Sequence, residues 1–152
     1  KIAPRDFSIG VNTFAVLAAI VNGEGNYFSD VTWSVEATSP NTIITRDGIL
    51  VIGADELDGD ITIRATSVLD ISQYDEIVVT VDRSIPSSYK AVLAVVVEPK
   101  NYAIYKSYNA IFNASVVGIN IYNQQVIWSL ERNTSEYTVD IITSPNNILD
   151  SQ

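Results

Sequence analysis

The sequence predicts an all-β protein made of two tandem modules, and three observations support this prediction. Short runs rich in β-branched and aromatic residues alternate with turn signals about every eight to twelve residues. No stretch has the pattern of a long amphipathic helix, and the run 14–20, which has the length of a short helix, lies between strand-like neighbours. Two long stretches of the chain also align with each other without a gap.

Seven strands are predicted in the first copy. The alternation is clearest where Ile61, Ile63 and Ala65 fall on one face and the residues between them on the other, as a half-buried antiparallel strand requires. Turns are predicted where Gly and Asn accept positive φ and Asp caps the bend, at residues 22–26, 39–41, 47–48 and 58–60. The predicted strands are residues 7–9, 14–21, 31–35, 42–45, 49–52, 61–66 and 76–81.

The internal repeat places residues 2–36 on residues 97–131 at a constant offset of 95. Eleven of the thirty-five aligned positions are identical, and the strongest match sets V-T-W-S-V-E at 31–36 against V-I-W-S-L-E at 126–131. A period of this length is too long for a solenoid unit and fits one small domain used twice. Arrays of like modules are more often built for reach and contact than for chemistry.

The natural boundary between the two modules is the segment after the last strand of the first copy. Pro86 cannot donate to a strand ladder, and the serines around it suit a solvated connection. The sequence therefore predicts a first domain at residues 1–82, a linker at 83–90 and a second domain at 91–152, which opens with an apolar strand at 91–98.

The composition excludes several kinds of site. The chain contains no cysteine and no histidine, so it has no disulfide, no thiolate metal site, no thiol nucleophile and no imidazole base. A formal net charge of -9 repels nucleic acid and anionic lipid surfaces. No apolar run approaches the roughly 18 residues of a membrane span. Because Lys1 begins in mid-pattern, we expect an excised or mature fragment.

The motifs of the first copy follow one another in a recognisable order. I-x-P at 2–4, V-T-W-S-V at 31–35 and D-G-I-L-V at 47–51 are followed by I-T-I-R-A-T-S at 61–67 and I-V-V-T-V at 77–81. In this order the sequence resembles the bacterial immunoglobulin-like domain. It is similar in particular to the group-2 type, which is found in bacterial surface adhesins and in tailed-phage capsid and tail proteins.

The resemblance implies an immunoglobulin-like β-sandwich of about seven strands with no catalytic residues and no cofactor. Trp33 and Trp128 match the V-T-W-S position and are expected to fill the core, and Gly48 is expected to form a turn. The second copy lacks the last two strands of the family pattern. Three explanations remain open: a longer parent chain, a reduced fold, or a strand donated by another subunit.

Tyrosine and asparagine concentrate in the second copy and are candidates for contact with sugars. A tyrosine ring can stack on a pyranose face, and an amide makes paired hydrogen bonds. The alternative is that these tyrosines simply cover a half-exposed sheet face. The residues concerned are Tyr102, Tyr105, Tyr108, Tyr122 and Tyr137, with Asn101, Asn109, Asn113, Asn120 and Asn123.

Acidic residues cluster at Asp55, Glu56, Asp58 and Asp60, and Asp70 and Asp75 follow in a later loop. Calcium takes about six to eight oxygen ligands, so such a cluster could begin a calcium site, although its order differs from that of an EF-hand. A solvated turn is the alternative. A pair of glycosidase carboxylates is a third interpretation, without a recognised cleft to support it.

The sequence thus favours a non-catalytic tandem immunoglobulin-like module on a phage virion or a bacterial surface, with no cofactor and no metal. It is expected to act as a structural spacer and a weak adhesion element for cell-surface glycans. The partners expected are other subunits of the assembly and such glycans, with no nucleic acid and no membrane insertion. The alternative function is an accessory domain of a secreted polysaccharide-degrading enzyme, which a catalytic sequence elsewhere in the parent gene would identify.

Overall fold

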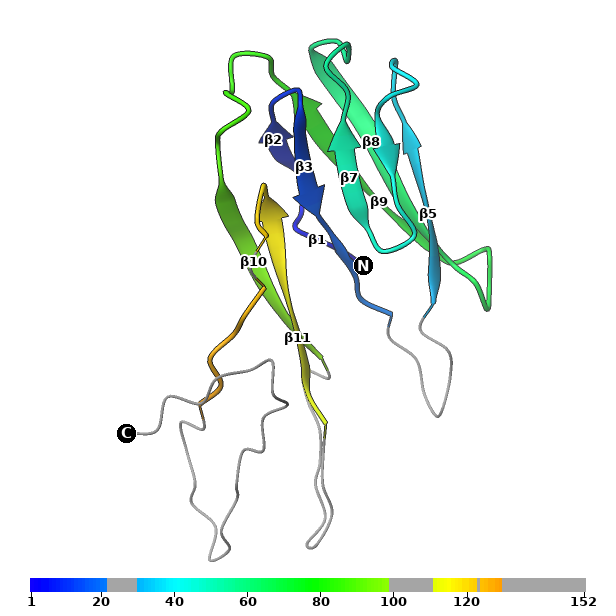
Figure 1. The fold of residues 1–152 in the computed structure, drawn as a ribbon. Helices are drawn as coiled ribbons and strands as arrows, with labels where there is room; N and C mark the ends of the chain where they lie inside the picture. The colour runs from blue at the N-terminus through cyan, green and yellow to red at the C-terminus, as the bar shows by residue number, and fades with distance from the viewer. Residues whose placement is uncertain (22–29, 99–110, 123, 130–152) are drawn as a thin grey trace, which may run out of the picture. The chain divides into compact units, whose positions relative to one another are not determined.

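The computed structural model describes residues 1–21, 30–98, 111–122 and 124–129 (Figure 1). The chain divides into two compact units, Lys1–Tyr122 and Asn123–Gln152. Every regular element in the described ranges is a β-strand, and all of them belong to the first unit. The predicted all-β class is confirmed, including the run 14–20, which forms strands rather than a helix.

One sheet has four strands in the order β2-β9-β8-β5. β2 runs parallel to β9, whereas β9, β8 and β5 are antiparallel neighbours. The alternation predicted for β8 is present, because Ile61, Ile63 and Ala65 are buried and Arg64 between them is exposed. The strands are β2 (Phe7–Ile9), β5 (Val31–Glu36), β8 (Gly59–Ser67) and β9 (Tyr74–Val81).

A second sheet has five strands in the order β10-β11-β3-β7-β6, all antiparallel to their neighbours. β1 and β4 form a separate antiparallel pair. This pair is connected directly to the second sheet, because only Leu17 separates β4 from β3 in the chain. These strands are β1 (Ile2–Ala3), β3 (Thr13–Val16), β4 (Ala18–Ala19), β6 (Ile43–Ile44), β7 (Ile49–Ile52), β10 (Ala91–Glu98) and β11 (Asn113–Ile119).

The hydrophobic core takes apolar side chains from both sheets, an arrangement consistent with a β-sandwich. Trp33 on β5 packs against this core but is only half-buried, so it lies less deep than expected. The buried members are Ile2, Ile9, Ala15, Leu17, Leu50, Ile52, Ile61, Ile63, Ala65, Ile77, Val79, Val81 and Ile119.

The strands that follow the predicted linker add to the sheet of the first copy. β10 and β11 pair with each other, and the end of β11 pairs with β3 through Gly118 opposite Val16 and Ile119 opposite Ala15 (Figure 1). Ile119 is only 1 % exposed and belongs to the same core. The boundary at residues 83–90 stays a prediction, because the two compact units divide after Tyr122 rather than there.

The strand expected around Trp128 is not formed in the described part of the second unit. Residues 124–129 lie outside regular secondary structure, and Trp128 is half-buried. A strand requires a hydrogen-bonded neighbour, and no described strand pairs with this segment. Because Trp33 is half-buried as well, the core position expected for Trp128 stays a prediction.

Candidate functional site

The predicted acidic cluster lies in the turn between β7 and β8 and at the start of β8, and Glu56 is its buried member. Its side chain is fully buried, and its carboxylate accepts hydrogen bonds from the backbone amides of Thr38 (3.0 Å) and Ser39 (3.1 Å). The Thr38 hydroxyl donates to the same carboxylate. Glu56 thus links the β7–β8 turn to the turn that follows β5.

Burial raises the pKa of Glu56, but its hydrogen bonds act in the opposite direction and prevail. The hydroxyls of Thr38 and Thr42 lower this pKa most, and the amides of Thr38 and Ser39 lower it further, to about 2. Glu56 is therefore ionised at neutral pH. Its charge is matched by donors that belong to the fold.

The other carboxylates of the cluster have separate partners. Asp55 accepts a hydrogen bond from the Ser39 hydroxyl (2.6 Å) and two from the Asn41 amide (3.1 and 3.2 Å). The hydrogen bond from Ser39, followed by that from Asn41, lowers the pKa of Asp55. Asp58 accepts from the backbone amide of Arg83 (2.7 Å), and Asp60 accepts from the Thr80 hydroxyl (2.7 Å).

These contacts do not bring the acidic residues together around one point. No group of three or more Asp or Glu side chains in the described ranges is placed to hold a metal ion. The arginine of the linker adds to the same structural network, since the Arg83 guanidinium donates to the carbonyl oxygens of Glu56 (2.6 Å) and Ala54 (3.2 Å). Among the interpretations of the cluster, the geometry favours the turn, although its Glu56 is buried rather than solvated.

Of the tyrosines considered for sugar contact, only Tyr122 lies within the described residues. Its side chain is 80 % exposed, and its ring meets Phe14 edge to face, with centroids 4.9 Å apart. The Lys90 ammonium lies 5.7 Å from the Tyr122 ring centroid. Tyr102, Tyr105, Tyr108 and Tyr137 fall outside the described residues, as do Asn101, Asn109 and Asn123.

The asparagines of β11 and its end differ from each other. Asn113 is exposed at the start of the strand, whereas Asn120 is buried and adopts a left-handed conformation with φ of 50°. The Asn120 side chain accepts from the Phe14 amide (3.2 Å) and donates to the carbonyl oxygens of Ser87 (2.9 Å) and Tyr89 (2.8 Å). Asn120 is therefore a structural residue that ties the linker to β3, whereas the sequence had named it only as a candidate for sugar contact.

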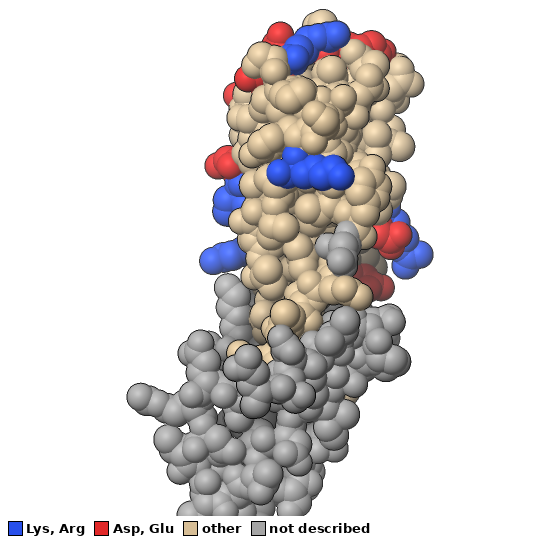
Figure 2. Space-filling view, turned by 60° about the vertical axis from the view of Figure 1, so that its left-hand side comes forward, with Lys and Arg blue, Asp and Glu red and all other residues tan. Residues whose placement is uncertain are grey.

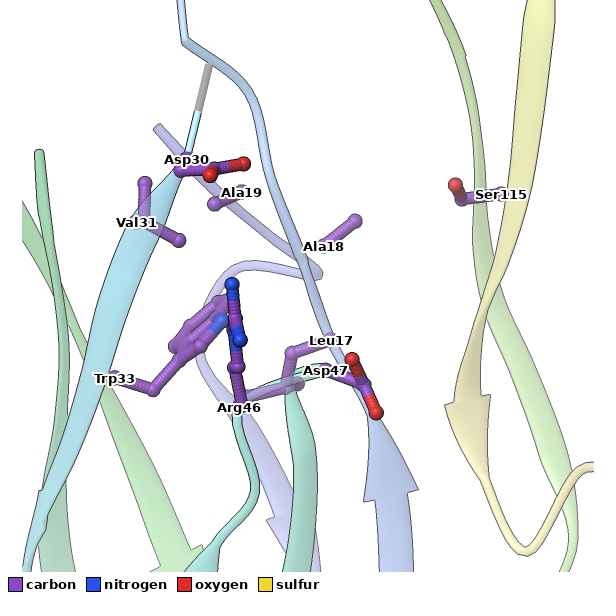
Figure 3. A pocket seen from close by; sticks show the side chains of 9 residues that line it. All are labelled: Leu17, Ala18, Ala19, Asp30, Val31, Trp33, Arg46, Asp47 and Ser115. Carbon is purple, nitrogen blue, oxygen red and sulfur yellow. The ribbon is translucent and has the colours of Figure 1, made fainter. Parts of the chain in front are cut away.

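A hollow of about 490 Å³ opens beside Trp33 (Figure 3). It lies within the first unit, where the turn between β6 and β7 approaches β4 and the start of β5. The sequence pattern predicted a core role for Trp33 and gave no sign of this hollow. The lining residues are Leu17, Ala18, Ala19, Asp30, Val31, Trp33, Arg46, Asp47 and Ser115.

Charged side chains are scattered over the face of the molecule that Figure 2 presents, with blue and red residues interspersed. Two ion pairs form at the surface of the described part of the chain, Arg5 with Asp75 and Arg64 with Glu76, each at 2.6 Å. The described part of the chain contains no helix that could span a membrane.

The sequence matches no protein-family model, and no curated protein is significantly similar to it.

Proposed function

We propose that this chain is a non-catalytic tandem immunoglobulin-like module of a phage virion or bacterial surface protein. In that setting it is a structural spacer and a weak adhesion element for cell-surface glycans. The proposal depends on one observation above all, which is the order of the strands in the two sheets.

Immunoglobulin-like sandwiches place the first, second, fifth and fourth strands in one sheet and the third, sixth and seventh in the other. If β3 and β4 count as one strand, β1, β3–β4, β7 and β6 follow the first of these orders, and β5, β8 and β9 follow the second. β2, which follows β1 in the chain, crosses to the other sheet and runs parallel to β9. This agreement supports the immunoglobulin-like identity.

Stiffness at the joint supports the spacer role. The Asn120 amide holds the carbonyl oxygens of Ser87 and Tyr89, and the Asp82 amide donates to the Ile9 carbonyl (2.9 Å). Two linker carbonyls are thus held by the residue that follows β11, and the residue just before the linker is held by β2. A spacer transmits position only if its joints are held in this way.

Adhesion by such a module relies on copy number more than on single-site affinity. When many modules sit on one particle or cell, each binding event raises the effective concentration for the next, so weak contacts add to strong attachment. The carboxylates of the β7–β8 turn, which were candidates for catalysis, are engaged in hydrogen bonds within the fold. This engagement supports a binding role over hydrolysis.

The test compares retention with turnover on the same polysaccharides. The purified chain is run by affinity electrophoresis through gels that contain starch, galactomannan or yeast mannan, and reducing ends are assayed after long incubation with each. We expect retarded migration in at least one gel and no release of reducing ends. Turnover that survives repurification would contradict the non-catalytic role, and unretarded migration in every gel would contradict adhesion.

A further inference from the structure

Trp33 is the aromatic residue among those that line the hollow, and a glycine turn packs against its ring. Gly48, at φ of +78°, lies against the Trp33 ring so closely that a Cβ there would come within 3.2 Å of Cζ2 and 3.3 Å of Cε2. The same Cβ would come within 2.7 Å of the Leu17 carbonyl oxygen. The glycine turn therefore supports the indole and fixes its position before any ligand arrives.

Polar groups also line this hollow. Asp30, Arg46 and Asp47 line the hollow with Trp33, and all three are exposed (Figure 3). None of their side chains forms an ion pair or hydrogen bond with another described residue. Arg46 differs in this from Arg5, Arg64 and Arg83, whose guanidinium groups are all bonded. The hydrogen-bonding capacity of these three side chains is thus available to a ligand.

We propose that this hollow binds one neutral hexose unit of a glycan. A hexose has an apolar face of C–H groups that stacks on an indole ring, and a rim of hydroxyls that both donate and accept hydrogen bonds. The two carboxylates accept from such hydroxyls, and the guanidinium donates to them. A volume of about 490 Å³ lies in the range of small-molecule sites. This inference rests on the proposed function and identifies the residues at which the chain would bind a glycan.

The charge of the site decides between classes of sugar. Two carboxylates and one guanidinium are among the groups that line the hollow, and the whole chain has a net charge of -9. Sialic and uronic acids would meet net repulsion there, whereas a neutral hexose would not. The ligand class is therefore neutral sugars such as glucose, galactose and mannose.

The experiment follows the indole N–H resonances of the full chain by NMR while D-glucose, D-galactose and D-mannose are each added to millimolar concentrations. The chain contains two tryptophans, so Trp128 serves as an internal reference for Trp33. We expect a saturable shift of the Trp33 resonance with at least one sugar and none with D-glucuronate. No saturable shift of that resonance with any of the three sugars would overturn the proposal.

Variants locate the site without disturbing the core. Arg46→Ala and Asp47→Asn change exposed side chains that have no described partner, and each should weaken binding about tenfold, the effect of one hydrogen bond to a charged group. Ile71→Ala, which shortens a side chain that is 81 % exposed and does not line the hollow, should leave the affinity unchanged. Unchanged binding in both Arg46→Ala and Asp47→Asn would place the sugar elsewhere and overturn this site.

The two proposals fail in different ways. If the wild-type chain is retained by a polysaccharide gel but the variants are retained equally, the hollow is not the site while adhesion stands. If the wild type is not retained by any gel and shows no saturable shift, both adhesion and this site are contradicted. The spacer role is tested separately, through Asn120.

Discussion

At the scale of single residues, the acidic turn shows that sequence composition and three-dimensional geometry can predict different roles for the same side chains. Four carboxylates within six positions of the sequence suggest a cation site. In the fold, however, each carboxylate accepts hydrogen bonds from donors of its own. Glu56 depends most on its hydrogen bonds, because a buried charge is costly unless donors of the fold replace its lost hydration. Its contribution to stability therefore depends on its ionisation.

Glu56→Gln is expected to lower the free energy of unfolding at pH 7 by about 2 kcal/mol, since the amide replaces one charged acceptor with a donor. The folded-state pKa of Glu56 is lowered from 4.5 to about 2, so its stabilisation is present above pH 4.5 and is lost as the pH falls toward 2. The difference between wild type and variant should therefore shrink over that window. Urea denaturation at pH 7, 4 and 2.5 measures it.

Asp60→Asn is the matched control for Glu56→Gln. Asp60 lies in the same cluster but is exposed and accepts one described hydrogen bond, from Thr80. Its loss is expected to change the free energy of unfolding by about 0.5 kcal/mol or less. An equal effect of the two substitutions at pH 7 would contradict the special role assigned to the buried carboxylate.

Gly48 and Gly59 form a second matched pair. Both have positive φ, +78° and +136°, but a Cβ on Gly48 would meet Leu17 and Trp33, whereas a Cβ on Gly59 has no heavy atom within 4 Å. Gly48→Ala should lower the free energy of unfolding by about 3 kcal/mol and Gly59→Ala by about 1 kcal/mol. Urea denaturation followed by tryptophan fluorescence compares them, and similar losses would mean that backbone strain alone matters at Gly48.

At the scale of elements, the regular strands were the most predictable part of the chain. β8 and β9 alternate between buried and exposed residues as their sequences indicate, because one face of each meets the core. The pairing of β11 with β3 was not predictable, since no local pattern says which neighbour an apolar strand will choose. Asn120 completes that pairing by holding both β3 and the linker.

Asn120→Asp keeps the acceptor that Phe14 uses but removes both donations to the Ser87 and Tyr89 carbonyl oxygens. We expect the free energy of unfolding to fall by about 2 kcal/mol and amide hydrogen exchange to accelerate in residues 83–90. Asn113→Asp, at the exposed start of β11, the strand that Asn120 follows, is the control. Unchanged exchange in the linker of the Asn120 variant would remove the support for a stiff joint and for the spacer role.

At the scale of the whole molecule, one core joins residues that the sequence assigns to different modules. Twelve of its thirteen buried members come from residues 2–81, which agrees with a first module that is nearly complete in itself. Ile119 comes from the other side of the predicted linker. The two predicted modules are thus coupled by shared burial.

Fragments test this coupling and the predicted boundary together. A fragment of residues 1–90 is expected to fold, but with a free energy of unfolding about 3 kcal/mol below that of residues 1–122, because it lacks the burial of Ile119 and the hydrogen bonds of Asn120. Thermal and urea denaturation of both fragments measure the difference. An unfolded 1–90 fragment would contradict the boundary, and equal stability would mean that β11 adds nothing to the core.

The sequence by itself determined the all-β class and most strands of the first copy, because alternation and turn residues act over a few neighbouring positions. It also indicated that Trp33 packs against the core. It did not predict β1 or the break between β3 and β4. Only the tertiary structure decided that the acidic turn is closed by hydrogen bonds, that β11 joins β3, and that Trp33 borders a hollow. Those features depend on contacts between residues that are far apart in the sequence. Burial and hydrogen bonding stabilise such contacts only in the folded chain, so no local pattern reveals them.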